Sequence, residues 1–106
     1  MIVVNRFRVS EADQSAFRDD LERARETLAV QSGYVAGGIG RNVDDPELWV
    51  LTTEWEGPGA YRRALSAYDV KLSAVPTLSR ALDEPSAYEV VEPGTTLNTP
   101  GARSLG

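Results

Sequence analysis

The side chains best suited to chemistry in this sequence are aromatic and amide groups around Trp55. Residues 49–61 predict a β-strand, a turn at Gly57-Pro58-Gly59 and a helix that carries Tyr61. The indole N–H of Trp55 can donate to an oxygen of a bound molecule, although core packing is the commoner role for such a residue. Asn5 lies inside another predicted strand, where its amide either orients a ligand oxygen or bonds to the backbone at a bulge.

Tyrosines and glycines give weaker signals. Tyr61 and Tyr68 are seven residues apart and share one helix face, which indicates core packing more than catalysis, although tyrosine hydroxyls at a pocket rim can serve both purposes. The stretch Gly37-Gly38-Ile39-Gly40 is not a dinucleotide-binding fingerprint, because it lies within a strand and opens no helix. A close backbone approach or a bulge explains it better, and the space above these glycines could admit a flat ligand.

The composition excludes several classes of function. The chain of 106 residues carries a net charge of −5 and contains neither histidine nor cysteine. It therefore lacks an imidazole base, a Ser-His-Asp triad, a thiolate nucleophile and the usual ligands for zinc or haem. No basic stripe is available for nucleic acid, no apolar run approaches bilayer length, and the first residues lack the layout of a signal peptide. We expect a cytoplasmic protein without a metal or cofactor.

Hydrophobic periodicity divides the chain into strands and helices. Strands are predicted at residues 2–9, 34–42, 49–56 and 88–92. A first helix begins at residues 10–13 and is ended by Gly33, and its apolar face consists of Phe17, Leu21, Ala24 and Leu28. A second helix is predicted at residues 58–68, and residues 69–82 are helix-like but should be broken into two short pieces by Pro76.

This β-α-β-β-α-β order predicts a ferredoxin-like α+β domain over residues 1–92, with a four-stranded antiparallel sheet. Right-handed crossovers are expected to place the first and third strands side by side, as a parallel pair at its centre. Both helices should cover one face of the sheet, which receives Trp49, Leu51, Thr53 and Trp55. Residues 93–106 predict an extended C-terminal tail that packs on the domain or on a partner protomer.

Apolar side chains are also predicted on the second face of the sheet. Two arginines and two glutamates accompany them there, so that the face comprises Ile2, Val4, Arg6, Arg8, Val50, Thr52, Glu54 and Glu56. Such a face needs a second cover, and the simplest cover is the same face of another copy related by a two-fold axis. The arginines adjoin the strand that carries the glutamates, so their charges could compensate on burial. We predict a homodimer through the sheet faces, with exposed cross-strand pairs on a monomer as the alternative.

Several short motifs resemble the antibiotic biosynthesis monooxygenase superfamily. They are Asn5-Arg6 on the first strand, Gly33-Tyr34 at the start of the second, the aliphatic-Thr-x-x-Trp ending of the third, and Trp55-Glu56 followed by Tyr61. The resemblance covers about residues 1–92. It implies a dimeric α+β barrel with a pocket in each protomer between the sheet and the helices.

The resemblance extends to two branches of that superfamily. One branch makes quinones by oxidising phenolic polycyclic substrates with molecular oxygen and no cofactor, and its tryptophan and following tyrosine match Trp55 and Tyr61. The asparagine that this branch places four residues before its tryptophan is Leu51 here. A haem-degrading branch shares a first-strand asparagine, matched by Asn5, but it needs a histidine ligand that this chain lacks.

Two hypotheses for function follow from these observations. The first is a cofactor-independent monooxygenase that acts on a small aromatic, phenol-bearing substrate with oxygen. Asn5, Trp55 and Tyr61 would be its catalytic residues, and substrate-binding residues would be Tyr34, Leu51, Leu65 and Tyr68. No residue is an obvious general base, so electrostatics and desolvation would ionise the substrate. The second is a non-catalytic small-molecule-binding or structural dimeric barrel. A cavity lined by Asn5 and Trp55 would favour the first, and a space filled by aromatic side chains would favour the second.

Overall fold

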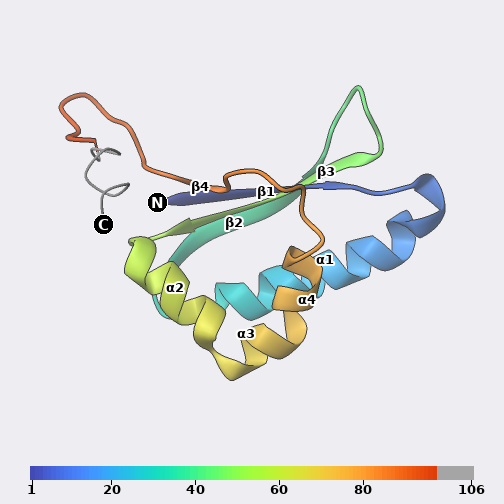
Figure 1. The fold of residues 1–106 in the computed structure, drawn as a ribbon, viewed down its shortest axis with the longest axis horizontal. Helices are drawn as coiled ribbons and strands as arrows, with labels where there is room; N and C mark the ends of the chain where they lie inside the picture. The colour runs from blue at the N-terminus through green and yellow to red at the C-terminus, as the bar shows by residue number, and fades with distance from the viewer. Residues whose placement is uncertain (98–106) are drawn as a thin grey trace.

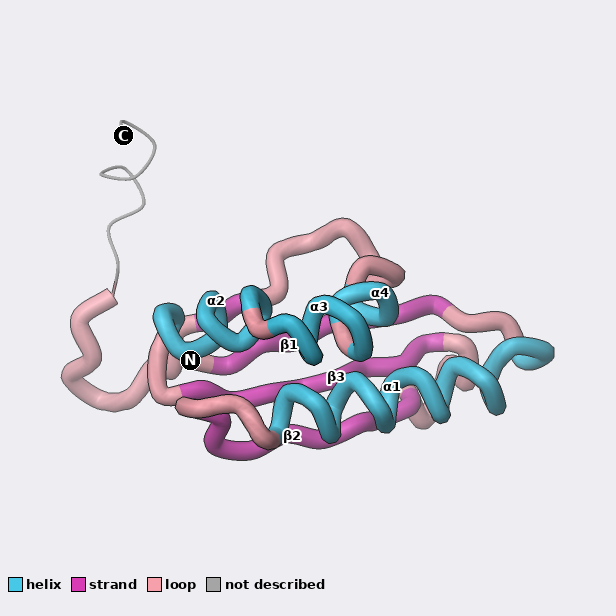
Figure 2. Tube along the Cα trace, turned by 90° about the horizontal axis from the view of Figure 1, so that it is seen from below, coloured by secondary structure: helices cyan, strands magenta, loops and turns pink. Residues whose placement is uncertain are grey.

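A computed structural model describes residues 1–97 as a four-stranded sheet with helices on one side only (Figures 1 and 2). The strands are β1 (Ile2–Arg8), β2 (Tyr34–Arg41), β3 (Leu48–Trp55) and β4 (Ala87–Tyr88). A short 3₁₀ turn, η1 (Glu11–Asp13), precedes α1 (Gln14–Ala29), and three shorter helices follow β3: α2 (Pro58–Ser66), α3 (Tyr68–Ser73) and α4 (Val75–Leu78). The predicted α+β, ferredoxin-like order is confirmed.

The sheet has the strand order β2-β3-β1-β4, and every neighbouring pair is antiparallel. The predicted side-by-side placement of β1 and β3 is therefore correct, but the predicted parallel pairing is wrong. Helix α1 returns the chain so that β2 runs in the same direction as β1, and the following hairpin reverses β3. The register of β1 with β3 runs from Ile2 opposite Glu54 to Arg8 opposite Leu48.

This register also separates the charges that were expected to compensate one another. Arg6 lies opposite Val50, away from the two glutamates of the third-strand region. It binds Glu84 through two bonds instead, from Nε to Oε2 at 2.8 Å and from Nη2 to Oε1 at 2.7 Å. Arg8 donates to Oδ2 of Asp45 at 3.0 Å. The arginines thus pair with loop carboxylates, and the predicted pairing with strand-three glutamates is wrong.

The core lies between the sheet and the helices, as the alternation of β3 predicts. Its four predicted inward-facing residues, Trp49, Leu51, Thr53 and Trp55, are all buried. They meet the buried face of α1, which consists of Phe17, Leu21, Ala24 and Leu28 as predicted. Phe17 packs with its ring centroid 5.1 Å from that of Phe7 and 6.0 Å from that of Trp49.

The second half of the helical layer consists of three short helices, as the sequence predicts, with somewhat different boundaries. Pro58 occupies the first turn of α2, where its missing N–H costs nothing. The helix stops at Ser66 because Ala67 is extended, with φ −67° and ψ 141°. Pro76 lies in the first turn of α4, so residues 68–78 form two short helices, as expected of a proline in this region.

The fourth strand is much shorter than the predicted 88–92. Its two residues pair with the start of β1, Tyr88 with Ile2 and Ala87 with Val3. Tyr88 lies opposite Ile2, which is the first residue of β1. The chain therefore leaves the sheet edge at this point (Figure 1). Of the predicted tail, residues 98–106 lie outside the described part of the structure. Within residues 1–97, every helix is too short or too polar to cross a bilayer.

Candidate functional site

The candidate site is built around three aromatic rings at the end of β3. The ring of Trp55 lies edge-on to Tyr34, with centroids 5.3 Å apart and an interplanar angle of 88°, and its centroid is 5.5 Å from that of Tyr61. Gly37 makes this arrangement possible, because a Cβ atom there would collide with the hydroxyl of Tyr34. Gly33, with φ +89°, similarly leaves no room for a side chain against Ala60. We call Tyr34, Trp55 and Tyr61 the aromatic cluster.

The indole of Trp55 is part of the core and its donor is already used. Trp55 is buried, and its Nε1 donates to Oγ1 of Thr53 at 2.9 Å. Thr53 lies two residues earlier on the same strand face, so the bond closes within one side of β3. The indole therefore supports the rings beside it and offers no free N–H to a ligand in this arrangement.

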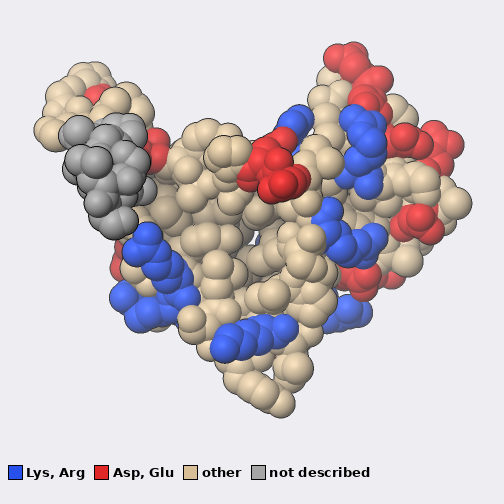
Figure 3. Space-filling view, viewed as in Figure 1, with Lys and Arg blue, Asp and Glu red and all other residues tan. Residues whose placement is uncertain are grey.

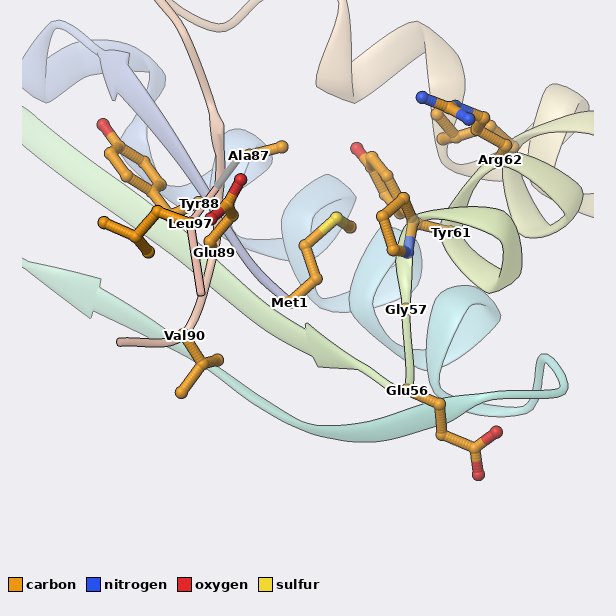
Figure 4. A pocket seen from close by; sticks show the side chains of 12 residues that line it. Met1, Glu56, Gly57, Tyr61, Arg62, Ala87, Tyr88, Glu89, Val90 and Leu97 are labelled. Atoms are coloured by element: carbon orange, nitrogen blue, oxygen red, sulfur yellow. The ribbon is translucent and has the colours of Figure 1, made fainter. Parts of the chain in front are cut away.

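A cavity of about 780 Å³ lies next to the aromatic cluster, at the ends of β1 and β3. This volume is within the range of small-molecule sites. One wall comes from α2 and the turn before it, and the other from the chain at and beyond β4 (Figure 4). The lining residues are Met1, Glu56, Gly57, Pro58, Tyr61, Arg62, Leu65, Ala87, Tyr88, Glu89, Val90 and Leu97.

The polar groups of this cavity are unevenly placed. Figure 4 shows the hydroxyl of Tyr61 and the side chain of Arg62 extending in the same direction, while Glu56 extends the opposite way. Met1 lies between the walls, and its amino group donates to the carbonyl of Trp55 at 2.9 Å. In the space-filling view, basic side chains gather over α2 beside a largely uncharged surface (Figure 3). The lining therefore combines apolar side chains with the Tyr61 hydroxyl and the Arg62 cation of α2, and it also includes the carboxylates of Glu56 and Glu89.

Burial determines what Tyr61 can do. Desolvation raises the pKa of its hydroxyl above the ordinary tyrosine value. The phenol is therefore protonated at neutral pH, and it acts as a hydrogen-bond donor to a ligand oxygen. It is a poor candidate for a general base.

The structure distributes the seven sequence-predicted site residues over three places. Tyr61 and Leu65, one helical turn apart on α2, line the cavity. Tyr34 and Trp55 stand behind Tyr61 in the aromatic cluster. The other three residues do not line the cavity. Asn5 and Leu51 face each other across β1 and β3, and Tyr68 on α3 is 78% exposed. Asn5 is partly buried on the same strand face as Val3 and Phe7, and its amide makes no hydrogen bond within residues 1–97.

Sequence reasoning missed the residues that come from the two ends of the described chain. Met1 and Leu97 both line the cavity, and no local pattern brings them together. Arg62 was not assigned to the site from the sequence, because charged side chains on helices are usually solvated. Its place next to Tyr61 on α2 was the available signal, since that helix was already expected to border the pocket.

The acidic residues do not assemble into a metal site. No group of three or more histidine, cysteine, aspartate or glutamate side chains converges within the part of the chain that the structure describes. Among the acidic residues, Glu84 instead forms a two-bond ion pair with Arg6. The hydrogen bond from Arg6 lowers the pKa of Glu84, and this pair fixes the chain just before β4.

Comparison with known proteins identifies the fold and the family. A family model described as antibiotic biosynthesis monooxygenase matches residues 1–71, about two-thirds of the chain. The chain belongs to this family. A curated relative, a 42.8 kDa protein in the whiE locus of Streptomyces coelicolor, is 32% identical over 53 residues, which is 50% of this chain and 13% of that protein. The match thus spans a small part of that longer protein.

Solved structures of the family have the same architecture. SnoaB, a cofactor-independent oxygenase from Streptomyces nogalater, is similar with a TM-score of 0.71 at 24% identity, covering 86% of this chain and 92% of SnoaB. A point variant of SnoaB gives a TM-score of 0.67 at 26% identity and covers 92% of this chain and 96% of the variant. The ferredoxin-like architecture that the sequence predicts is thus the fold of a known oxygenase.

Proposed function

We propose that this protein is a cofactor-independent monooxygenase that oxidises a small aromatic, phenol-bearing molecule with molecular oxygen. The observation that carries the proposal is the 780 Å³ cavity beside the aromatic cluster, in a chain that belongs to the antibiotic biosynthesis monooxygenase family. The similarity to SnoaB, described as a cofactor-independent oxygenase, supports the same reaction class. We also propose the cytoplasm as the place of this reaction, as the sequence predicts.

The reaction needs no electron donor besides the substrate. A phenol ring and one molecule of oxygen give a quinone and one molecule of water. One oxygen atom becomes the new carbonyl oxygen, and the second leaves as water with the two hydrogens lost from the ring carbon and the hydroxyl. The protein then has to bind the ring, exclude water and favour the phenolate, which is the form that passes electrons to oxygen.

The cavity residues suit these tasks in different ways. Tyr61 donates its hydroxyl proton in a hydrogen bond to the phenolate oxygen, and Arg62 supplies the positive charge on the same side. Leu65 and Met1 provide apolar contact with the ring. Trp55 acts through Tyr61 by packing against its ring, since its own N–H is bonded to Thr53. Asn5 stays in the proposal as an amide that has no hydrogen-bond partner within residues 1–97, on the helix-facing side of the sheet.

The bonded indole favours a second function. Because Trp55 Nε1 is satisfied internally and Leu51 stands where the quinone-forming branch has asparagine, the same cavity suits a protein that binds an aromatic molecule without oxidising it. The two functions differ in oxygen consumption. Both require that a phenolic ligand bind the cavity.

We further propose that two copies associate through the uncovered face of the sheet. Figure 1 shows the helices on one side of the sheet, and the opposite side presents half-buried Ile2, Val4 and Val50. Val50→Lys would place a charge in this contact and is expected to yield monomers in sedimentation velocity. Val43→Lys, in an exposed turn, is the matched control. Equal association of both variants would contradict a dimer through this face.

Oxygen uptake with a panel of polycyclic phenols tests the main proposal. We expect Tyr61→Phe to lower kcat by about 10²-fold, within the range found when a single oxyanion donor is removed. Arg62→Gln is expected to lower kcat about tenfold, whereas Arg63→Gln, next to it but outside the cavity lining, should match wild type. Asn5→Ala and Trp55→Phe complete the series.

The outcomes separate the two functions. Binding of a phenol without oxygen consumption would favour the non-catalytic function. Oxygen uptake that is equal in wild type and in all four cavity and sheet variants would remove these residues from the mechanism.

A further inference from the structure

A second groove, of about 460 Å³, lies between α1 and the hairpin formed by β2 and β3. It is lined by Gln14, Ser15, Arg18 and Glu22 of α1, and by Ile39, Gly40, Arg41 and Trp49 of the hairpin. None of these residues lines the first cavity. The groove is therefore separate from the proposed oxidation site, and no part of that reaction uses it.

The groove has more donors than acceptors. Arg18 makes no ion pair or hydrogen bond within residues 1–97, and Arg41 donates one hydrogen bond, from Nη1 to Oε1 of Gln14 at 3.0 Å. The single carboxylate of the lining, Glu22, already pairs with Arg25 at 3.3 Å. Two guanidinium groups thus face a groove without a free counter-charge, although the whole chain has a net charge of −5.

One residue that lines the groove has a hydrogen-bond donor without a partner in the described chain. Trp49 is 7% exposed, and its Nε1 is the one buried side-chain nitrogen or oxygen without a hydrogen-bond partner in the described part of the chain. A buried donor left unpaired is unfavourable, and such a group in a native protein calls for an explanation. The guanidinium of Arg41 lies over the same indole, 5.9 Å from the ring centroid. The unpaired indole donor and a guanidinium without an ion pair therefore both line this groove.

We propose that this groove binds a small organic molecule through an oxyanion group, a carboxylate or a phosphate, held between Arg18 and Arg41. Guanidinium groups suit such anions because they donate two parallel hydrogen bonds to a pair of oxygens. The apolar part of the molecule lies against Ile39 and Trp49, and an acceptor atom takes the indole N–H. The volume of the groove, near the lower end for small-molecule sites, limits the ligand to a small one.

A ligand titration of uniformly ¹⁵N-labelled protein, followed in ¹H–¹⁵N correlation spectra, tests this site. Sodium citrate, sodium benzoate and sodium pyrophosphate are added separately, with sodium chloride at equal ionic strength as reference. The proposal expects saturable shifts at residues 14–22 and 39–41 and at the indole N–H of Trp49. The second indole signal, from Trp55 bonded to Thr53, should remain in place. Saturation by the carboxylates alone identifies a carboxylate site, and saturation by pyrophosphate alone identifies a phosphate site.

Two arginine variants and one control decide whether the groove is responsible. Arg18→Gln and Arg41→Gln are each expected to weaken binding about tenfold, since hydrogen bonds to charged groups contribute about this much. Arg18→Gln is the more decisive variant, because the Arg18 side chain has no hydrogen bond or ion pair to lose within the described chain. Arg23→Gln, on the same helix but paired with Asp20, should bind as wild type does. Equal affinities of the Arg18 and Arg23 variants, shifts that do not saturate, or equal shifts with sodium chloride would overturn the proposal.

Discussion

Thr53→Val tests how much the hydrogen bond between Trp55 and Thr53 contributes to the stability of the fold. Thr53 is 2% exposed, and its Oγ1 is the acceptor for Trp55 Nε1 at 2.9 Å. Valine has nearly the same shape but cannot accept the bond, so the indole N–H would be buried without a partner. The unpaired donor costs about 1–3 kcal/mol, and exchanging a buried hydroxyl for a methyl group offsets roughly 1 kcal/mol of that cost.

We therefore expect a net loss of up to about 2 kcal/mol in the free energy of unfolding. For a domain of this size, that loss corresponds to a decrease in Tm of up to roughly 15 °C. Urea titration gives the free energy, a thermal scan gives Tm, and the indole region of a ¹H–¹⁵N spectrum shows whether the Trp55 N–H has lost its acceptor.

Thr52→Val provides a matched control at the neighbouring position. Thr52 faces the other side of the sheet, and its only described side-chain bond is a long one, from Oγ1 to the carbonyl of Gly38 at 3.4 Å. Its replacement should change stability by no more than about 0.5 kcal/mol. If both valine variants were equally stable, the Thr53 bond would contribute nothing, and Trp55 would be free to serve a ligand.

Three further substitutions test other features of the structure. Gly33→Ala should destabilise the fold by about 1–3 kcal/mol in urea titration, because φ +89° is unfavourable for alanine and its Cβ would meet Ala60; wild-type stability would show that the turn adjusts freely. Glu84→Gln should lower stability at neutral pH but not in acid, because Arg6 lowers the pKa of Glu84. The carboxylate loses its contribution to stability as the pH falls through that lowered pKa, so a stability difference independent of pH would contradict this. Tyr61→Phe should remove a tyrosine component that ionises above the ordinary tyrosine range in an ultraviolet titration, because burial raises the pKa of Tyr61. Loss of a component within the ordinary range instead would count against burial of this hydroxyl.

Alternating and helical periodicities were sufficient to predict the core. The faces of β3 and α1 follow from the spacing of Trp49, Leu51, Phe17 and Leu21, because burial on one face of a regular element is a local property. Strand direction and the length of β4 were not predictable in this way. Both depend on pairing partners, and β4 stops at Tyr88 because the β1 strand beside it begins at Ile2.

The candidate site was only partly accessible to sequence reasoning for a related reason. Tyr61 and Leu65 could be predicted because one helix face presents both. The bond between Thr53 and Trp55 also had a local signal, since residues two apart on a strand share a face. Met1, Arg62 and Leu97 needed the assembled structure, because the cavity wall arises where distant segments meet.

This origin of the cavity wall affects the order in which the protein becomes competent during synthesis. Every buried residue of the described chain lies between Val3 and Thr77, whereas one wall of the cavity begins at Ala87. A nascent chain can therefore collapse around its aromatic interior while the ligand chamber is still open on one side. A chain that ends prematurely just after Ser86 would then fold but would lack one wall of the chamber. Such a product would keep its fold and lose its ability to bind the ligand.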